Sequence, residues 1–300
     1  MLTLAHLSDP HIGPLPSIRV RDIAGKPGLG WLNWHRGRRD VHRMDVLDTL
    51  LKDLAAQAPD HIAVTGDIVN IALPGEYAAG RALLERIGPP ERVSLVPGNH
   101  DAYTVKGVTH LLASFDPWMR GDDAGAHPLD EDHRFPYVKV RDGVALIGLS
   151  TAVPTGLFMA TGKLGHRQIS KLRQILPRLA REGLARVILL HHPVRRQDAG
   201  PMAMLVDCDK LNATLREFGA DLVLHGHIHR DTVHRLKGPN GPIPVVCVPS
   251  ASAAPERSRW PAAYNLFRIE RGPDGVVIHH ALRGFKSAGH PIEIIREGML

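Results

Sequence analysis

Short apolar runs alternate along the chain with longer segments in which apolar residues recur every three or four positions. The short runs lie at 62–64, 93–96, 187–190 and 222–224 and consist mainly of Val, Ile and Leu. Runs of this length are typical of buried strands. Helical spacing is found between them, with one apolar face at Met44, Leu47, Leu51 and Leu54 and another at Ile169, Leu172, Ile175, Leu176 and Leu179. This alternation predicts a layered α/β fold.

The last third of the chain has a different pattern. Residues 210–218 predict a short helix that ends at Gly219. The runs at 245–248, 266–269 and 276–279 then predict strands of a second sheet, with no helix between the last two. No role is predicted for 284–300. With 300 residues, 43% hydrophobic content and no linker-like stretch, the chain predicts a single domain over 1–300.

Polar clusters follow the predicted strands at five places. They are Asp9-Pro10-His11, Gly66-Asp67 through Asn70, Gly98-Asn99-His100-Asp101, His191-His192-Pro193 and Gly226-His227-Ile228-His229. Loops at strand ends carry the chemistry of α/β folds. Residues i and i+2 of extended chain point to the same side, so the two outer residues of Asp-x-His and of His-x-His are expected to converge. His191 and His192 should point to opposite faces, which leaves one of them as an easy ligand.

Each cluster alone is an ordinary turn, but the five in this order resemble the calcineurin-like metallophosphoesterase superfamily, whose blocks are DxH, GDxx(D/N), GNH(D/E), HxP and GHxH. The match covers residues 4–229. The resemblance implies a four-layer α/β/β/α sandwich, here with an inserted cap segment. It implies that Asp9, His11 and His229 hold one metal, that Asn99, His191 and His227 hold the other, and that Asp67 bridges both. The HxP block selects His191, and Asn70, where the family often has Asp, is not carried over as a ligand.

The implied centre is binuclear. Imidazole, carboxylate and amide ligands suit manganese, iron or zinc better than magnesium, and the sequence does not choose among these three. The mechanistic hypothesis is that a metal-bridging hydroxide attacks phosphorus. His100, which is similar to the family's non-ligand histidine facing the substrate, would contact the phosphoryl oxygens or protonate the leaving oxygen, and Asp101 would orient its imidazole.

The expected activity is metal-dependent hydrolysis of phosphoric esters. A net charge of +6 and a pI near 9.5 suit a small anionic substrate without distinguishing its class. Because the chain resembles cyclic-nucleotide and glycerophosphodiester phosphodiesterases, phosphodiester hydrolysis is the leading interpretation. The alternatives are hydrolysis of a lipid-linked phosphate or pyrophosphate, as in UDP-diacylglucosamine pyrophosphatases, and a nuclease, although no DNA-binding module is recognisable. A non-catalytic scaffold is disfavoured because all seven ligand positions are filled.

An insert at about 13–40, between the first and second clusters, departs from a minimal domain. It leaves the end of the first strand and is therefore expected to cap the active site. It carries Trp31 and Trp34 beside Arg36, Arg38 and Arg39. Tryptophan followed by basic residues is typical of contact with anionic membrane lipid. The alternative is a capping loop whose tryptophans pack on the core while its arginines are solvated.

The sequence predicts a cytoplasmic protein, peripheral at the inner membrane surface if the insert contacts lipid. Cys208 and Cys247 lie in unlike contexts and form no CxxC motif, which favours a reducing compartment. Residues 1–7 lack the basic start and full apolar core of a signal peptide and predict a strand. No run approaches the roughly 18 apolar residues that a membrane span requires. The sequence leaves the oligomeric state open.

Overall fold

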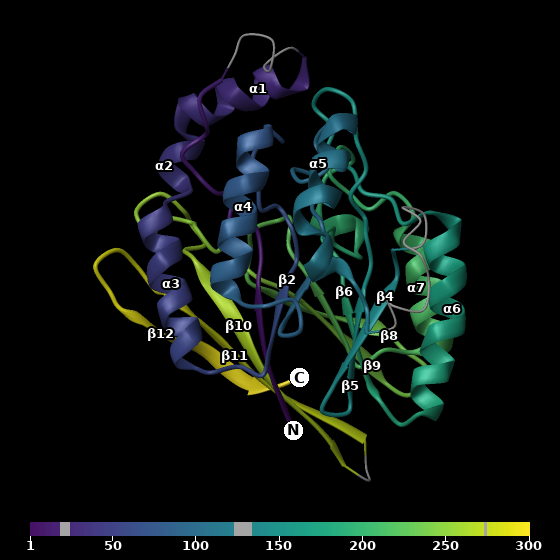
Figure 1. Ribbon diagram of the computed structural model, residues 1–300. Coiled ribbons are helices and arrows are strands. Elements are labelled where there is room, and N and C mark those ends of the chain that lie inside the picture. Colours follow the sequence, from purple (N-terminus) through teal and green to yellow (C-terminus); the bar gives the residue numbers. More distant parts are fainter. Residues whose placement is uncertain (19–24, 123–133, 273–274) are drawn as a thin grey trace.

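Two sheets pack face to face, and helices cover the outer face of each sheet (Figure 1). This architecture is seen in a computed structural model that describes residues 1–18, 25–122, 134–272 and 275–300. Six residues of the insert, 19–24, lie outside the described part. One cluster of buried apolar residues joins the facing sides of the two sheets, including Leu4 and Val64 from one sheet and Leu189 and Leu224 from the other. The predicted α/β/β/α fold is confirmed, whereas the single domain over 1–300 stays a prediction.

The first sheet has six strands in the order β12-β11-β10-β1-β2-β3. Its strands are β1 (Leu2–Leu7), β2 (His61–Val64), β3 (Val93–Leu95), β10 (Ala263–Gly272), β11 (Gly275–Phe285) and β12 (Ile292–Met299). The strands β1, β2 and β3 run parallel, with Leu7 level with Val64 and Val64 level with Leu95. Their carboxyl ends therefore meet at one edge of the sheet.

The second sheet has six strands in the order β4-β5-β6-β7-β9-β8. Its strands are β4 (Tyr137–Arg141), β5 (Val144–Gly148), β6 (Ala185–Leu189), β7 (Leu222–His225), β8 (Thr232–Lys237) and β9 (Pro242–Cys247). The central pair β6 and β7 is parallel, with Leu189 level with Leu224. Both strands end at the same side of the molecule as β1, β2 and β3, which brings the loops of the two sheets together (Figure 1).

Amphipathic helices flank the sheets. They are α3 (Met44–Ala56), α4 (Pro74–Ile87) and α5 (Val105–Phe115) on the first sheet, and α6 (Gly165–Arg181) and α7 (Cys208–Phe218) on the second. In α3, Leu47, Leu50 and Leu54 are buried at helical spacing, and α6 buries Leu172 and Leu176 in the same way. Short 3-10 turns lie at Asp116–Met119 and Arg196–Asp198.

The insert forms a bent helical segment over the strand ends. It consists of α1 (Lys26–Asn33), a π-helical turn (Trp34–Arg38) and a short α2 (Arg39–Val41). In Figure 1 this segment lies at the top of the molecule, on the side opposite both chain termini. The sequence pattern does not predict helix here, because three glycines and two tryptophans in 28–37 obscure the apolar spacing.

The grouping of the late strands was predicted wrongly. Of the three runs assigned to one second sheet, the first lies in β9 and pairs with β7, whereas the other two lie in β10 and β11 and pair with β1 and with each other. Residues 284–300, for which no role was predicted, include β12, a half-exposed edge strand beside β11. Apolar spacing marks a strand but carries no information about its neighbour.

In the described part of the chain, no helix is both long and apolar enough to cross a membrane. Cys208 and Cys247 are both buried free thiols.

Candidate metal centre

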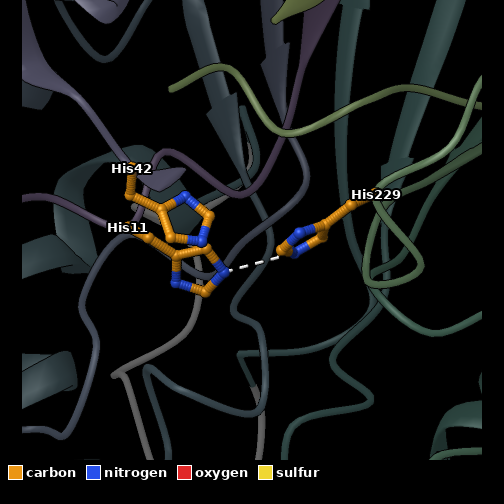
Figure 2. A group of neighbouring side chains, drawn as sticks. All are labelled: His11, His42 and His229. Atoms are coloured by element: carbon orange, nitrogen blue, oxygen red, sulfur yellow. Dashed lines mark hydrogen bonds between the residues drawn. The ribbon is translucent and has the colours of Figure 1, made fainter. Parts of the chain in front are cut away.

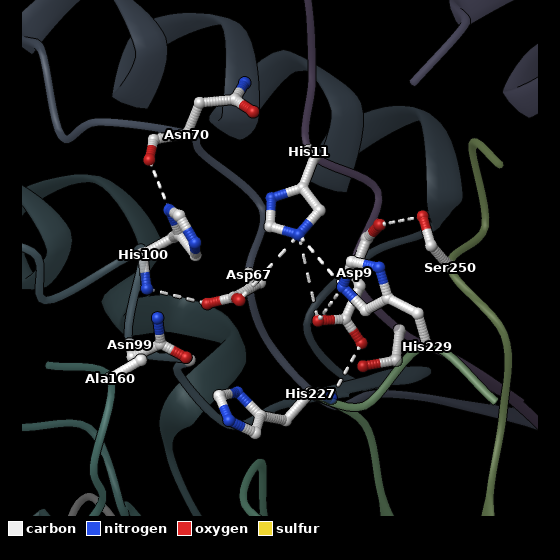
Figure 3. A network of polar contacts seen from close by, with 12 residues as sticks. Asp9, His11, Asp67, Asn70, Asn99, His100, Ala160, His227, His229 and Ser250 are labelled. Atoms are coloured by element: carbon white, nitrogen blue, oxygen red, sulfur yellow. Dashed lines mark hydrogen bonds and ion pairs between the residues drawn. The ribbon is translucent and has the colours of Figure 1, made fainter. Parts of the chain in front are cut away.

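The predicted ligands lie together where parallel strands of the two sheets end. Asp9 and His11 follow β1, Asp67 follows β2 and Asn99 follows β3 in the first sheet, whereas His191 follows β6 and His227 and His229 follow β7 in the second. Figure 3 shows six of these side chains turned toward a common space, namely Asp9, His11, Asp67, Asn99, His227 and His229. Neither sheet supplies the complete set.

The ligand loops do not use the extended backbone that the sequence analysis assumed. Asp9, His11, Asp67, His227 and His229 all have positive φ, between 40° and 71°. Such left-handed conformations cost a non-glycine residue roughly 1–2 kcal/mol each. The side chains converge because left-handed residues turn the chain sharply, and the rest of the fold must stabilise these turns.

Two glycines allow these loops to approach each other. A Cβ added at Gly98 would collide with the backbone and carboxylate of Asp67, and one at Gly226 would collide with Ser8 and the carboxylate of Asp9. The glycine of the GNH block and the glycine of the GHxH block are therefore required for close packing against a ligand from another strand.

The first cluster contains Asp9, His11, Asp67 and His229. The Nε2 atom of His11 lies 3.3 Å from Nε2 of His229, 3.9 Å from Oδ1 of Asp9 and 3.8 Å from Oδ2 of Asp67. Oδ1 of Asp9 lies 3.2 Å from Nε2 of His229. Burial, followed by the charge of Arg38, lowers the pKa of His11 well below its usual value, so the ring is neutral.

The second cluster contains Asp67, Asn99, His191 and His227. The Nε2 atom of His191 lies 3.3 Å from Oδ2 of Asp67, 3.2 Å from Oδ1 of Asn99 and 3.2 Å from Nδ1 of His227. Burial alone would lower the pKa of His191, but the charge of Asp67 raises it to about 9. Burial would raise the pKa of Asp67, but nearby imidazoles, His191 first, hold it well below its usual value.

The donor set fits two divalent ions. Nδ1 of His11 faces the carbonyl of Val69 at 3.3 Å, and Nδ1 of His191 faces the carbonyl of Thr65 at 2.6 Å. These carbonyls accept the proton of Nδ1, so Nε2 is the ring nitrogen that would bind a metal. Ligands about 2.1 Å from a tetrahedral metal lie about 3.4 Å apart, close to the separations in both clusters. The Oδ2 atom of Asp67 faces both clusters, toward His11 in the first and His191 in the second.

The ring nitrogens of His192 are turned away from the clusters, although its ring packs against that of His227 with centroids 4.5 Å apart. Its Nδ1 contacts the hydroxyl of Thr151 at 2.7 Å and its Nε2 contacts the carbonyl of Ala160 at 3.0 Å. Both ring nitrogens are therefore occupied, whereas the neighbouring His191 faces Asp67.

Asp101 has a different contact set from the one expected. Its carboxylate accepts backbone N–H groups of Asp67, Ile68, Val69 and Gly98 at 2.8, 2.8, 3.1 and 2.9 Å. The imidazole of His100 contacts the carbonyl of Asn70 instead. Asp101 lies behind the ligand loops and holds the loop after β2 against the loop after β3. The expectation that Asp101 orients the His100 ring is thus wrong for the contacts in this structure.

A second buried carboxylate, on Glu76, completes this support. Glu76 in α4 accepts backbone N–H groups from Asn70 at 2.6 Å, Ile71 at 3.1 Å and Leu73 at 2.9 Å. It thereby fixes the peptide whose carbonyl faces His100. The sequence offered no signal for Glu76 beyond its place in the first turn of a helix.

His100 lies at the open side of the clusters. Its ring stacks on Tyr103 with centroids 5.3 Å apart, and its backbone N–H donates to Oδ1 of Asp67 at 2.7 Å. Burial, followed by the charge of Arg38, lowers the pKa of His100 to about 4. Because Asn70 faces Nδ1, the other ring nitrogen, Nε2, is the one that faces the opening.

The insert divides its aromatic and basic residues between two environments. Trp34 is buried against Gly13, and the guanidinium of Arg38 points inward to His11 and His100. Arg36 and Arg39 are exposed, and Trp31 is half-buried with its ring 4.4 Å from that of His35. The capping interpretation therefore accounts for Trp34 but not for Arg38, which is not solvated.

His42, at the end of the insert, was missed by the sequence analysis. Figure 2 shows its ring against His11 and facing His229. Its ring centroid lies 4.6 Å from that of His11, and its Nδ1 lies 2.9 Å from the hydroxyl of Ser252. Ring nitrogens of these three histidines lie within 4.8 Å of one another. His42 follows no strand, so no pattern in the sequence distinguishes it from the other histidines.

Comparison with known proteins agrees with this geometry. The model of the calcineurin-like phosphoesterase family matches residues 2–231. A probable cyclic nucleotide phosphodiesterase from Rhodococcus erythropolis is 29% identical over 184 residues, which cover 60% of this chain and 54% of that protein. The glycerophosphodiester phosphodiesterase GpdQ from Enterobacter lignolyticus is 34% identical over 100 residues, 33% of this chain and 30% of that protein. The matches thus span about half and under a third of these curated relatives.

Solved structures share the fold at low sequence identity. A dimetal phosphatase from Danio rerio superposes with a TM-score of 0.62 at 13% identity, covering 99% of this chain and 98% of that one. The purple acid phosphatase PPD1 from yellow lupin superposes with a TM-score of 0.58 at 12% identity, covering 99% and 53%. The family model matches most of the residues, including every ligand position described above, and the chain therefore belongs to the calcineurin-like phosphoesterase family.

Proposed function

We propose that this protein is a metal-dependent phosphoester hydrolase that prefers phosphodiesters of the cyclic-nucleotide or glycerophosphodiester type. The observation that carries the proposal is the pair of ligand clusters that share the Asp67 carboxylate. Both curated relatives are named as phosphodiesterases, which supports the diester class. Imidazole, carboxylate and amide donors favour manganese, iron or zinc as the ions.

The chain supplies the ligands and the groups around them. One ion would be held by Asp9, His11, Asp67 and His229, and the other by Asp67, Asn99, His191 and His227. When bound, two divalent ions supply positive charge that polarises the phosphoester and activates water. The two aspartates return only part of that charge, so the site attracts an anion.

His100 is the proposed residue for contact with the reacting phosphoryl group. The Asn70 carbonyl holds its Nδ1 side, which leaves Nε2 directed toward the opening. The neutral ring carries its proton on Nδ1, so Nε2 would donate to a phosphoryl oxygen or to the leaving oxygen only as imidazolium, a form that a bound phosphate anion would favour. Such positioned acids typically contribute 10²–10⁴-fold to rate. His100→Ala should therefore reduce turnover most for esters with a poor leaving group.

A hydrolysis panel tests the proposed function. The protein is loaded separately with manganese, iron or zinc and offered bis-p-nitrophenyl phosphate, p-nitrophenyl phosphate, cyclic nucleotides and glycerophosphodiesters. We expect faster turnover of the diesters and loss of both metal and activity in Asp67→Asn. The control is Asp48→Asn, at an exposed carboxylate of α3 that pairs with Arg86. Preference for the monoester, or full activity in Asp67→Asn, would contradict the proposal.

A specific observation favours a second candidate, hydrolysis of a lipid-linked phosphate or pyrophosphate at a membrane surface. Large apolar side chains are exposed near the site, with Leu157 51%, Phe158 77% and Met202 50% exposed. Phe158 also lines a pocket of about 330 Å³ that includes Asn99 and His100. Exposed apolar clusters of this kind mark binding surfaces for apolar groups.

Liposome binding separates the two candidates. Trp31 and Phe158 are the informative positions, because Trp34 is buried and its replacement would disturb the insert. If the protein acts on a lipid-linked substrate, it should sediment with anionic liposomes. The double variant Trp31→Ser with Phe158→Ser should no longer do so. A protein that stays in the supernatant and hydrolyses only water-soluble diesters would remove the lipid candidate.

A further inference from the structure

One arginine of the insert, Arg38, is partly buried at the metal centre without an acidic partner. The Nε atom of Arg38 is buried and has no hydrogen-bond partner. Within the described ranges, no carboxylate lies at ion-pair distance from its guanidinium, whereas Arg39 has one such partner and Arg43 has two. A buried cation with unused donors is costly unless an anion compensates it.

The neighbours of Arg38 are two imidazoles of the site. Its Nη2 atom lies 3.1 Å from Nδ1 and 2.9 Å from Nε2 of His11, and 3.3 Å from Nε2 of His100. These contacts pair Nη2 with imidazole nitrogens and not with an anion, so they leave the charge of the guanidinium uncompensated.

The insert holds Arg38 in this position. Gly37, with φ of 149°, breaks the helical path just before it, so Arg38 turns inward while Arg36 and Arg39 remain exposed. Trp34 is buried beneath the same turn. Lys26, at the start of α1, donates to the hydroxyl of Thr155 at 2.7 Å and ties the insert to the opposite loop.

We infer that Arg38 is a substrate-binding residue whose guanidinium binds the non-bridging phosphoryl oxygens of the ester at the metal centre. The inference rests on the proposed function. A guanidinium presents donors in a planar fork that matches two phosphate oxygens, and an ammonium does not. Arg38 shares the space with His100, so the phosphoryl group would be held between two residues from separate segments of the chain.

Equilibrium binding of inorganic phosphate tests the inference without relying on turnover. Wild type, Arg38→Ala, Arg38→Lys and the control Arg43→Ala are loaded with the same metal, and metal content is measured first. Arg43 is a matched control because it is exposed and paired with Asp45 and Glu256. We expect unchanged metal content and a phosphate affinity reduced about 10-fold or more in Arg38→Ala, with partial recovery in Arg38→Lys.

Kinetics provide a second measurement. Loss of a phosphate-binding residue should raise KM for a diester in Arg38→Ala, with kcat reduced less than in His100→Ala. The inference is overturned if Arg38→Ala retains its metal and binds phosphate within about twofold of wild type, or if it loses metal, which would make Arg38 a support for His11. If metal-loaded wild type neither binds phosphate nor hydrolyses any ester, the proposed function is wrong, and the role of Arg38 falls with it. If wild type hydrolyses diesters but Arg38→Ala binds phosphate with unchanged affinity, only the inference about Arg38 is wrong.

Discussion

Replacing Asp101 by asparagine tests whether this carboxylate supports the ligand loops or acts in the chemistry. In the structure each carboxylate oxygen accepts two backbone N–H groups, Oδ1 from Ile68 and Val69 and Oδ2 from Asp67 and Gly98. Asparagine keeps one oxygen and directs an NH₂ group at the other two amides. The substitution is nearly isosteric, so packing is not an alternative explanation.

The magnitude follows from the two amides that lose their acceptor. All four amides are buried around Asp101, which is itself fully buried. A buried donor left without a partner costs about 1–3 kcal/mol, so the free energy of unfolding should fall by about 2–6 kcal/mol in Asp101→Asn. The loop that carries Asp67 would also lose its fixed position, and metal content should fall with stability.

The assay is urea unfolding of wild type, Asp101→Asn and the control Asp122→Asn, combined with metal analysis and turnover. Asp122 also accepts a backbone N–H, from Val140 at 2.7 Å, but in an exposed setting, so its substitution should cost much less. An Asp101→Asn protein with wild-type stability and metal content but no turnover would refute the reasoning. That result would restore a direct role for Asp101 at His100.

Further predictions concern packing, acid and metal. Gly226→Ala should lower the metal content because the added Cβ would collide with Asp9. The control Gly200→Ala, with no atom within 4 Å of the added Cβ, should leave the metal content unchanged. Equal metal content in the two variants, measured by elemental analysis, would contradict this prediction. Burial lowers the pKa of His61 and of His280 from 6.5 to about 3. The free energy of unfolding should therefore be highest above pH 6.5 and fall as the pH drops below that value, because only the unfolded state then takes up the protons. The expected loss is up to about 1.4 kcal/mol per pH unit for each histidine. Urea unfolding at pH 7.5 and 5.5 should show this loss, with a shallower dependence in His280→Gln. Chelation should lower the Tm by about 5 °C or more and added manganese should restore it; an unchanged Tm would mean that metal adds little to stability.

The sequence predicted the ligand positions well because they depend on residue order. Strand, turn and polar residue follow one another within a few positions, so the predicted site residues could be placed at strand ends without knowing the fold. The same local view predicted an extended backbone at Asp9 and His227, where the structure has left-handed residues. Backbone handedness at a non-glycine residue depends on tertiary hydrogen bonds, which the sequence does not display.

Residues that act across long sequence separations were not predictable in this way. His42 reaches the site through a bridge between its own backbone and that of Ala253, and Arg38 faces inward only because Gly37 turns the chain. Exposed and buried arginines of the insert have the same sequence context, so composition could not separate Arg38 from Arg39. Pairing of β10 with β1 was likewise hidden, because strand partners are chosen by the folded chain.

The division of the ligands between two sheets links metal preference to the protein interior. Asp67 follows a strand of the first sheet and His191 follows a strand of the second, so the spacing of the sheets sets their 3.3 Å separation. That spacing is fixed by core side chains such as Val64 and Leu224, which are not metal ligands. Manganese, iron and zinc differ in the coordination geometry they prefer. Adding or removing a single methyl group between the sheets would therefore tune which ion the enzyme selects while every coordinating residue stays unchanged.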